Sequence, residues 1–201
     1  MSIVKLNNRG VKDATAFGSI TGLGDLIFIS RSTASSSSSL SITSGLTSTY
    51  KEYIFFFNNI HPATNNANLQ FNMSIDGGSN YNVTKTSTHF RAYHEENGAS
   101  AALGYRTGDD LAQSTDYQTL ILEQGNDNDA NGAGILHLFD PSNTTFVKHF
   151  IFRGITDQSG NTARETYVAG YGNTTSAINA VRFQMSSGNM DSGTIDMYGV
   201  L

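Results

Sequence analysis

The sequence predicts an all-β protein, a jelly-roll-like two-sheet β-sandwich with an extended N-terminal arm. Three observations support this prediction. Short apolar or alternating runs recur at intervals of about 10 to 20 residues, the spacing typical of sandwiches and barrels. Glycine, asparagine and serine separate these runs, as turn residues do between strands. No segment shows the 3.6-residue hydrophobic period of an amphipathic helix.

Residues 1–24 are expected to form an extended docking arm, and residues 25–201 a single β-sandwich domain. The arm contains the turn-rich stretches NNRG and GSITGLG and no long periodic segment. Its basic residues Lys5 and Arg9 are interleaved with apolar residues such as Leu6. This pattern suggests a strap that lies on an acidic capsid or on a neighbouring subunit.

The domain then reads as a series of strands and turns. Strands are expected at 25–30 and 39–44, with the serine tract between them as a loop, and at 67–75, where apolar and polar residues alternate cleanly. The stretch DGGSN at 76–80 predicts a hairpin turn, because its two glycines accept positive φ without strain. Residues 108–117 could hold one short turn of helix. Further strands are expected at 50–60, 81–93, 117–123, 134–140, 145–155, 165–171, 179–187 and 193–201.

The run YIFFF at 53–57 breaks the alternation expected of a strand with one wet face. Its second face needs a cover, which is either a partner subunit or the chain's own N-terminal arm. At a partner, each large side chain would contribute about 1.5–3 kcal/mol by burial. The anchors would be either Phe55 with Phe57 or Ile54 with Phe56, depending on which pair faces outward.

Composition narrows the function classes. The net charge is −5 and only 14% of residues are charged, so clustered lysine and arginine for nucleic-acid binding are not expected. The chain has no cysteine, which excludes disulfides and thiolate metal sites. We expect no Sec-type signal, because the start MSIVKLNNRGVKD has no apolar core of signal-peptide length, and no membrane insertion, because no apolar run reaches about 18 residues.

Residues 126–132, NDNDANG, are the best candidate for a metal site. Asp127, Asp129 and Asn131 fit the opening of a calcium loop, in which alternate oxygen side chains wrap one ion. The twelfth position holds Leu138 instead of glutamate, which departs from the motif. The alternative is an acidic turn between two strands, and no other cofactor is expected.

The remaining polar clusters give no clear catalytic motif. The stretch YHEENG at 93–98 is expected to be a solvated hairpin tip, and His137 and His149 to be strand residues, with a two-histidine metal site as the alternative. Catalytic elbows, P-loops and dinucleotide fingerprints are absent from the sequence, so we expect no enzymatic activity. A glycan-binding face is a further alternative, because several tyrosines are candidates for stacking on sugars.

Four stretches in order resemble a family of virion proteins. They are KLNNRGVKDATAFGSI, STYKEYIFFFNNIHPAT, HLFDPSNTTFVKHF and SSGNMDSGTIDMYGVL. Together they resemble fibre-type or structural virion proteins of tailed bacteriophages of marine bacteria. The resemblance implies a β-sandwich, a homo-oligomer that is often a trimer, and a place on the particle surface, and it transfers no catalytic residue.

The sequence therefore predicts a non-enzymatic virion structural protein, assembled in the host cytoplasm. It would be displayed as a head decoration or appendage subunit, and its partners would be other copies of itself and capsid or tail subunits. The alternative is a receptor-binding module at a fibre tip that recognises a host surface glycan. A glycan-degrading enzyme that uses two acidic residues is the third reading.

Overall fold

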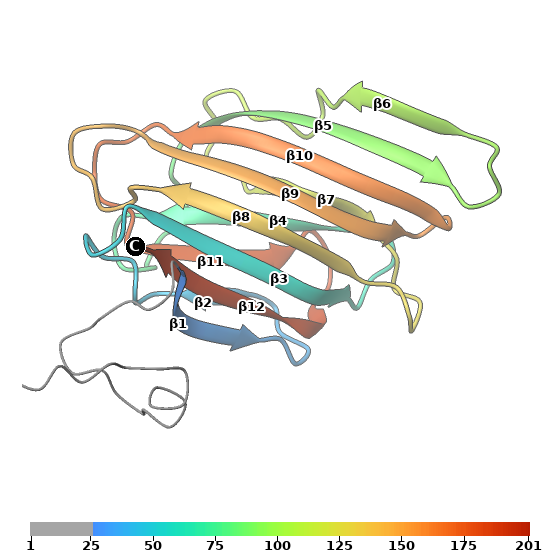
Figure 1. The fold of residues 1–201 in the computed structure, drawn as a ribbon, viewed down its shortest axis with the longest axis horizontal. Coiled ribbons are helices and arrows are strands. Elements are labelled where there is room, and N and C mark those ends of the chain that lie inside the picture. The colour runs from blue at the N-terminus through green and yellow to red at the C-terminus, as the bar shows by residue number, and fades with distance from the viewer. Residues whose placement is uncertain (1–25) are drawn as a thin grey trace, which may run out of the picture.

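The computed structural model describes residues 26–201, which form twelve antiparallel strands and no helix (Figure 1). The predicted all-β class is confirmed, and this part of the chain contains no helix that could span a membrane. The strands are β1 (Leu26–Thr33), β2 (Leu40–Ile42), β3 (Glu52–Pro62), β4 (Ala67–Ser74), β5 (Lys85–Glu95), β6 (Ala101–Tyr105), β7 (Gln118–Gln124), β8 (Gly132–Phe139), β9 (Lys148–Gln158), β10 (Thr162–Gly172), β11 (Ala180–Met185) and β12 (Met190–Val200).

Nine of the strands form a sheet that folds over on itself, in the order β1-β12-β3-β8-β9-β7-β4-β11-β2. The sheet bends back on itself between β9 and β7, where the only paired residues of these two strands are Gln124 and Gln158. At the opposite end, β1 and β2 come close without forming a ladder. The result is a nearly closed antiparallel sheet.

Strand β9 is also a branch point. Its second edge pairs with β10, which pairs with β5, which pairs with β6. The strands β1, β12, β3, β8, β9, β10, β5 and β6 are thus consecutive neighbours, and we call them the wide layer. The strands β7, β4, β11 and β2, which lie behind it in Figure 1, are the narrow layer.

The hydrophobic core fills the space between the two layers. Phe57 of β3 meets Phe183 of β11 with 5.1 Å between ring centroids, and Phe150 of β9 meets Phe71 of β4 at 5.0 Å. Both contacts are edge-to-face, the arrangement that aromatic rings favour. The alternation predicted for β4 places its apolar residues in this core.

The run YIFFF therefore divides between two faces. Tyr53, Phe55 and Phe57 point into the core and are at most 1% exposed. Ile54 and Phe56 point the other way, as the pleat of a strand requires. Of the two pairs that the sequence left open, Ile54 and Phe56 lie on the outside.

A pair of glycines makes room in the core for one ring. Gly134 of β8 and Gly154 of β9 are cross-strand partners, and a Cβ atom on either would lie within 2.7 Å of the Phe152 ring. The ring of Phe152 in turn meets Phe57 edge to face at 5.8 Å. The two glycines thus allow aromatic residues to pack close to the backbone of the wide layer.

Most of the predicted strands are present, with small shifts at their ends. The turn at 76–80 contains Gly77 and Gly78 at positive φ, as predicted, but the predicted hairpin is wrong, because β4 and β5 pair with other strands in different layers. Residues 108–117 contain turns and bends but no helix, and β6 was not predicted. The predicted arm, 1–24, lies outside the described residues.

Candidate functional site: the outer face of the wide layer

The outer face is the side of the wide layer that is turned away from the core. Antiparallel register aligns its residues into rows that run across the strands. One row crosses the whole layer through Arg31, Asp196, Phe56, Ile135, Arg153, Tyr167, Phe90 and Tyr105. Residues far apart in sequence therefore meet on one continuous surface.

This surface carries most of the exposed large hydrophobic side chains of residues 26–201. Ile151 and Ile155 of β9 are 50% and 53% exposed, although they lie in the middle of the layer. Apolar residues scattered over a surface are normal, whereas their concentration on one face favours an interaction site. The patch comprises Leu26, Phe28, Phe90, Leu103, Tyr105, Ile135, Ile151 and Ile155.

Aromatic contacts extend along the same face. The Tyr198 ring packs edge to face against Phe28 on one side and Phe56 on the other, both at 5.4 Å. Further along, Phe90 and Tyr167 stack with 4.9 Å between centroids. These rings hold one another in place, so the face presents a defined shape.

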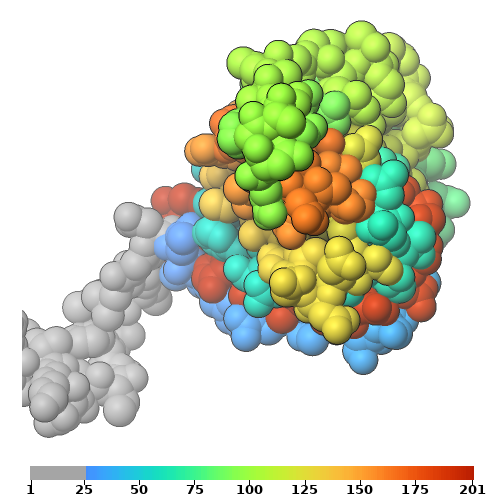
Figure 2. Space-filling model, turned by 90° about the vertical axis from the view of Figure 1, so that its right-hand side faces the viewer, coloured from blue at the N-terminus to red at the C-terminus, as the bar shows by residue number. Residues whose placement is uncertain are grey.

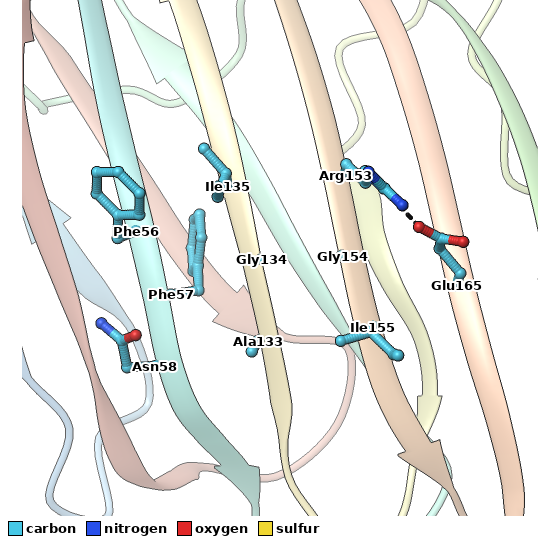
Figure 3. Close-up of a pocket in the computed structure, with 10 residues that line it drawn as sticks. All are labelled: Phe56, Phe57, Asn58, Ala133, Gly134, Ile135, Arg153, Gly154, Ile155 and Glu165. Carbon is cyan, nitrogen blue, oxygen red and sulfur yellow. Dashed lines mark hydrogen bonds and ion pairs between the residues drawn. The ribbon is translucent and has the colours of Figure 1, made fainter.

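A shallow groove of about 480 Å³ lies at the centre of this face (Figure 3). Phe56 and Ile135 line one side, and Arg153 and Glu165 form an ion pair on the other. Burial, the largest single effect, raises the pKa of the Glu165 carboxyl group, but the hydrogen bonds from Arg153 and Tyr167 and the charge of Arg153 together outweigh it and lower the pKa. Glu165 is therefore held as a carboxylate and is poorly suited to act as a general acid.

Two further acidic groups of this face have partners. Arg31 donates two hydrogen bonds to Asp196, at 2.6 and 2.7 Å, and lowers the pKa of that carboxyl group. His137 Nδ1 lies 2.5 Å from Glu52 Oε1. Arg31 with Asp196 and Arg153 with Glu165 neutralise each other locally, whereas Asp157 of β9 is exposed on this face with no ion-pair partner among residues 26–201.

The residues predicted to form an interface separate into two groups. Ile54 and Phe56 point toward the outer face, where Phe56 is partly exposed but Ile54 is only 9% exposed. Phe55 and Phe57 belong to the chain's own core, so the folded chain does not present them to a partner. Lys5, Leu6 and Arg9 lie outside the described residues.

The predicted calcium loop forms the turn between β7 and β8. Asp127, Asp129 and Asn131 lie there, and the Asp127 carbonyl accepts a hydrogen bond from the Ala130 amide at 2.9 Å. Within residues 26–201, no group of three or more histidine, aspartate or glutamate side chains is placed to hold a metal ion. Calcium binding by this loop stays a prediction.

The other polar candidates have partners within the chain. His94 and Glu95 end β5, and the Glu95 amide donates to the Ser100 carbonyl at 2.9 Å across a tight turn, as expected of a hairpin tip. His149 packs edge-on against Tyr171 at 6.1 Å. These contacts give each residue a structural role.

A buried polar cluster beneath β5 and β10 was not predicted. Lys85 and His89 are fully buried, on the core side of β5. The Lys85 ammonium donates to Asn72 Oδ1 at 2.6 Å and to the Val83 carbonyl at 2.8 Å, yet burial lowers its pKa to about 7. Burial also lowers the pKa of His89 to about 4, and neither of its ring nitrogens has a hydrogen-bond partner among the described residues. The sequence shows that two sets of residues alternate along this strand: Lys85, Ser87 and His89, and Thr86, Thr88 and Phe90. It does not show which set is buried.

Comparisons with known proteins found no counterpart: no family model, no curated protein and no solved structure matches the chain. The outer face is therefore interpreted from its own residues.

Proposed function

We propose that this protein is a non-enzymatic structural subunit of a bacteriophage virion, displayed as a homo-oligomer on the particle surface. The outer face of the wide layer is where one copy meets another copy or a neighbouring virion protein. The observation that carries this proposal is the gathering of exposed apolar side chains on this face, with Ile151 and Ile155 at its centre on either side of the Arg153–Glu165 ion pair. The resemblance of four sequence stretches to phage structural proteins supports the setting.

The size of the face suits a stable contact. Eight neighbouring strands spaced about 4.8 Å apart, each contributing about 20 Å of length, offer an area on the order of 700 Å². A standard protein–protein interface buries about 800 Å² on each partner. One copy could therefore engage a partner through this face alone, without a further domain.

The proposed fold type, assembly and arm contact rest on the sequence predictions. The folded-over sheet, with β3 and β9 facing β4 and β11 across one core, supports a variant of the jelly-roll-like sandwich. A trimer is the favoured assembly, as a head decoration or appendage subunit. The arm at 1–24 would add a second contact to a capsid or neighbouring subunit, and deletion of residues 2–18 should then reduce incorporation into particles.

A glycan receptor-binding role is the second candidate, and the central groove is the observation that favours it. Asn58, Arg153 and Glu165 supply hydrogen-bonding groups beside the Phe56 ring. Sugars stack on aromatic rings and bond to such polar groups. The aliphatic side chains of Ile135, Ile151 and Ile155 have no matching role with a sugar, so protein contact is the stronger reading.

Incorporation into particles tests the proposal. In phage particles assembled from a genome that encodes this chain, mass spectrometry should detect the wild-type chain, and Ile151→Lys should abolish its incorporation. Ile75→Lys is the matched control, because Ile75 is 44% exposed but follows β4 in the narrow layer. Absence of the wild-type chain from purified particles, or full incorporation of Ile151→Lys, would overturn the proposal. Binding to a glycan array, lost in Arg153→Ala, would instead support the receptor-binding role.

A further inference from the structure

The last strand of the wide layer, β6, ends the sheet with an open edge. It pairs with β5 and with no other strand in residues 26–201, and all five of its residues are exposed. In Figure 1 it forms the upper border of the wide layer, and Figure 2 looks onto the end where the β5–β6 hairpin (green) projects toward the viewer. The main-chain groups of this edge are not part of the outer face, although the side chains of Leu103 and Tyr105 are.

The hydrogen-bond pattern shows which main-chain groups are free. The Glu95 amide donates to the Ser100 carbonyl, and the Arg106 amide donates to the His89 carbonyl. In an antiparallel ladder every second residue bonds to the same neighbour, so Ser100, Ala102, Gly104 and Arg106 bond to β5. The intervening residues are Ala101, Leu103 and Tyr105. Their amides and carbonyls therefore point away from β5, in the plane of the sheet, and have no partner strand.

Nothing in β6 protects this edge. Natural proteins guard open edges with charged side chains, proline, bulges or a covering segment. The stretch from Ala99 to Tyr105, ASAALGY, contains neither charge nor proline, and its pairing with β5 shows no register shift. The opposite border of the wide layer, β1, carries both a register shift at Phe28/Ser30 and the charged Arg31.

We propose that β6 pairs with β6 of a second copy in an antiparallel, two-fold symmetric manner centred on Leu103. In this register each free amide of one copy faces a free carbonyl of the other copy. Leu103 opposes Leu103 of the partner, and Ala101 opposes Tyr105 of the partner. The three directly opposed pairs exchange six main-chain hydrogen bonds, and the large tyrosine ring lies beside a small alanine side chain.

A second copy fits this edge because the strand carries its own complement. The three residues with free main-chain groups are evenly spaced about Leu103, so a two-fold axis at Leu103 brings all three opposite a free residue of the partner. The strand carries no charge, so the two copies do not repel each other across this axis. The same residues lie in the rows of the outer face, so pairing joins the apolar faces of two copies into one surface.

The pairing goes beyond the proposed function. It uses main-chain groups at a sheet edge, whereas the proposed virion contact uses side chains on the outer face. They share the partner, another copy of this chain, and the side chains of Leu103 and Tyr105, which belong to the outer face. Recovery of the mass in a mixture of opposite charges at position 103 is specific to the edge pairing, and Ile151→Lys is specific to the centre of the face.

The test uses the prediction that residue 103 of one copy lies opposite residue 103 of the other copy. Leu103 is 72% exposed, so Leu103→Lys and Leu103→Glu should fold normally, as checked by circular dichroism. Each variant alone places like charges across the axis, and its mass by analytical ultracentrifugation should fall two-fold relative to wild type. Mixing the two variants in equal amounts should restore the wild-type mass, because a lysine of one copy then opposes a glutamate of the other. Leu103→Thr, which is neutral and keeps the amide, is the control and should leave the mass unchanged.

A crosslink gives an independent readout. The chain has no cysteine, so Leu103→Cys introduces a single thiol. Directly opposed residues in the proposed hydrogen-bonded pair lie about 5.5 Å apart at Cα, within reach of a short bis-maleimide crosslinker. Treatment with this reagent should give a covalent dimer from Leu103→Cys and not from Ile75→Cys. A wild-type mass in both charged variants, or no crosslink at position 103, would overturn the β6 pairing, and the face variant Ile151→Lys would still test the proposed function separately.

Discussion

The rings of Phe57 and Phe183 meet edge to face, with 5.1 Å between their centroids, and join β3 of the wide layer to β11 of the narrow layer. Phe183 also contacts Phe55 at 5.6 Å, so one ring of the narrow layer holds two residues of the YIFFF run. Phe56, which lies between these two residues in sequence, faces the opposite side of the sheet. Consecutive phenylalanines therefore have different roles.

Truncation of Phe57 and of Phe56 should have different consequences for stability. Phe57→Ala removes a fully buried ring and leaves a cavity, which should lower the free energy of unfolding by about 3–5 kcal/mol. Phe56→Ala removes a partly exposed ring and should cost about 1 kcal/mol or less in dilute solution. Urea denaturation of both variants at low protein concentration measures the difference. Equal losses would show that the division of the run between core and outer face is wrong.

Gly154→Ala should destabilise the fold although it adds one methyl group. The new Cβ would lie 2.5 Å from the Phe152 ring and 3.1 Å from the Ala133 carbonyl oxygen, and the backbone cannot easily yield. Overpacking of this kind typically costs about 1–3 kcal/mol. Gly160→Ala is the control, because its nearest neighbour is the end of the Gln158 side chain at 3.7 Å. Thermal unfolding measures the effect, and equal melting temperatures for the two variants would contradict this packing.

His89 should make the protein sensitive to mild acid. The unfolded chain binds a proton at a pKa near 6.5, whereas burial lowers the pKa of His89 in the folded chain to about 4. Between these values the unfolded state binds more protons, so stability falls as pH falls from about 6.5 to 4, by up to about 3 kcal/mol. His89→Leu should flatten this part of the pH profile, measured by urea denaturation. An unchanged profile in the variant would exclude His89 as the cause.

Lys85 should produce a second window, above neutral pH. Its pKa is about 7 in the folded chain and 10.5 in the unfolded chain, so the unfolded state binds more protons between these values. Stability should therefore rise as pH increases from about 7 toward 10. In Lys85→Met this rise should disappear, because the titrating group is gone. Denaturation midpoints at pH 7, 8 and 9 for both chains provide the measurement, and a rise that persists in the variant would assign it to another group.

The sequence predicted those parts of the fold that depend on local pattern. The alternation of Leu69, Phe71 and Met73 correctly indicated a core-facing strand, and Gly77 and Gly78 correctly indicated a turn. Strand β6 was missed because alanine and glycine have weak strand propensity, and pairing with β5 rather than composition holds it in place. Local pattern could not decide this feature.

The outer face was predictable only in part, for a related reason. The unbroken apolar run at 53–57 indicated that a second face needed a cover, but not which residues faced it. The rows that bring Phe56 next to Ile135 and Arg153 depend on the register between strands distant in sequence. Burial of Lys85 and His89 likewise depends on which side the narrow layer covers. The composition of the outer face and the burial of Lys85 and His89 both depend on pairing between strands that are distant in sequence. A single sequence does not reveal this pairing.

Sedimentation equilibrium of the purified chain tests the central claim most directly, namely that copies associate through the outer face. The wild-type chain should sediment as an oligomer, Ile151→Lys should shift it to lower mass, and Ile75→Lys should leave it unchanged. The shift is expected because a charge at the centre of the patch would lose its hydration at the contact without gaining a partner. A wild-type chain that stays a single copy of 21.6 kDa at high concentration would contradict the claim.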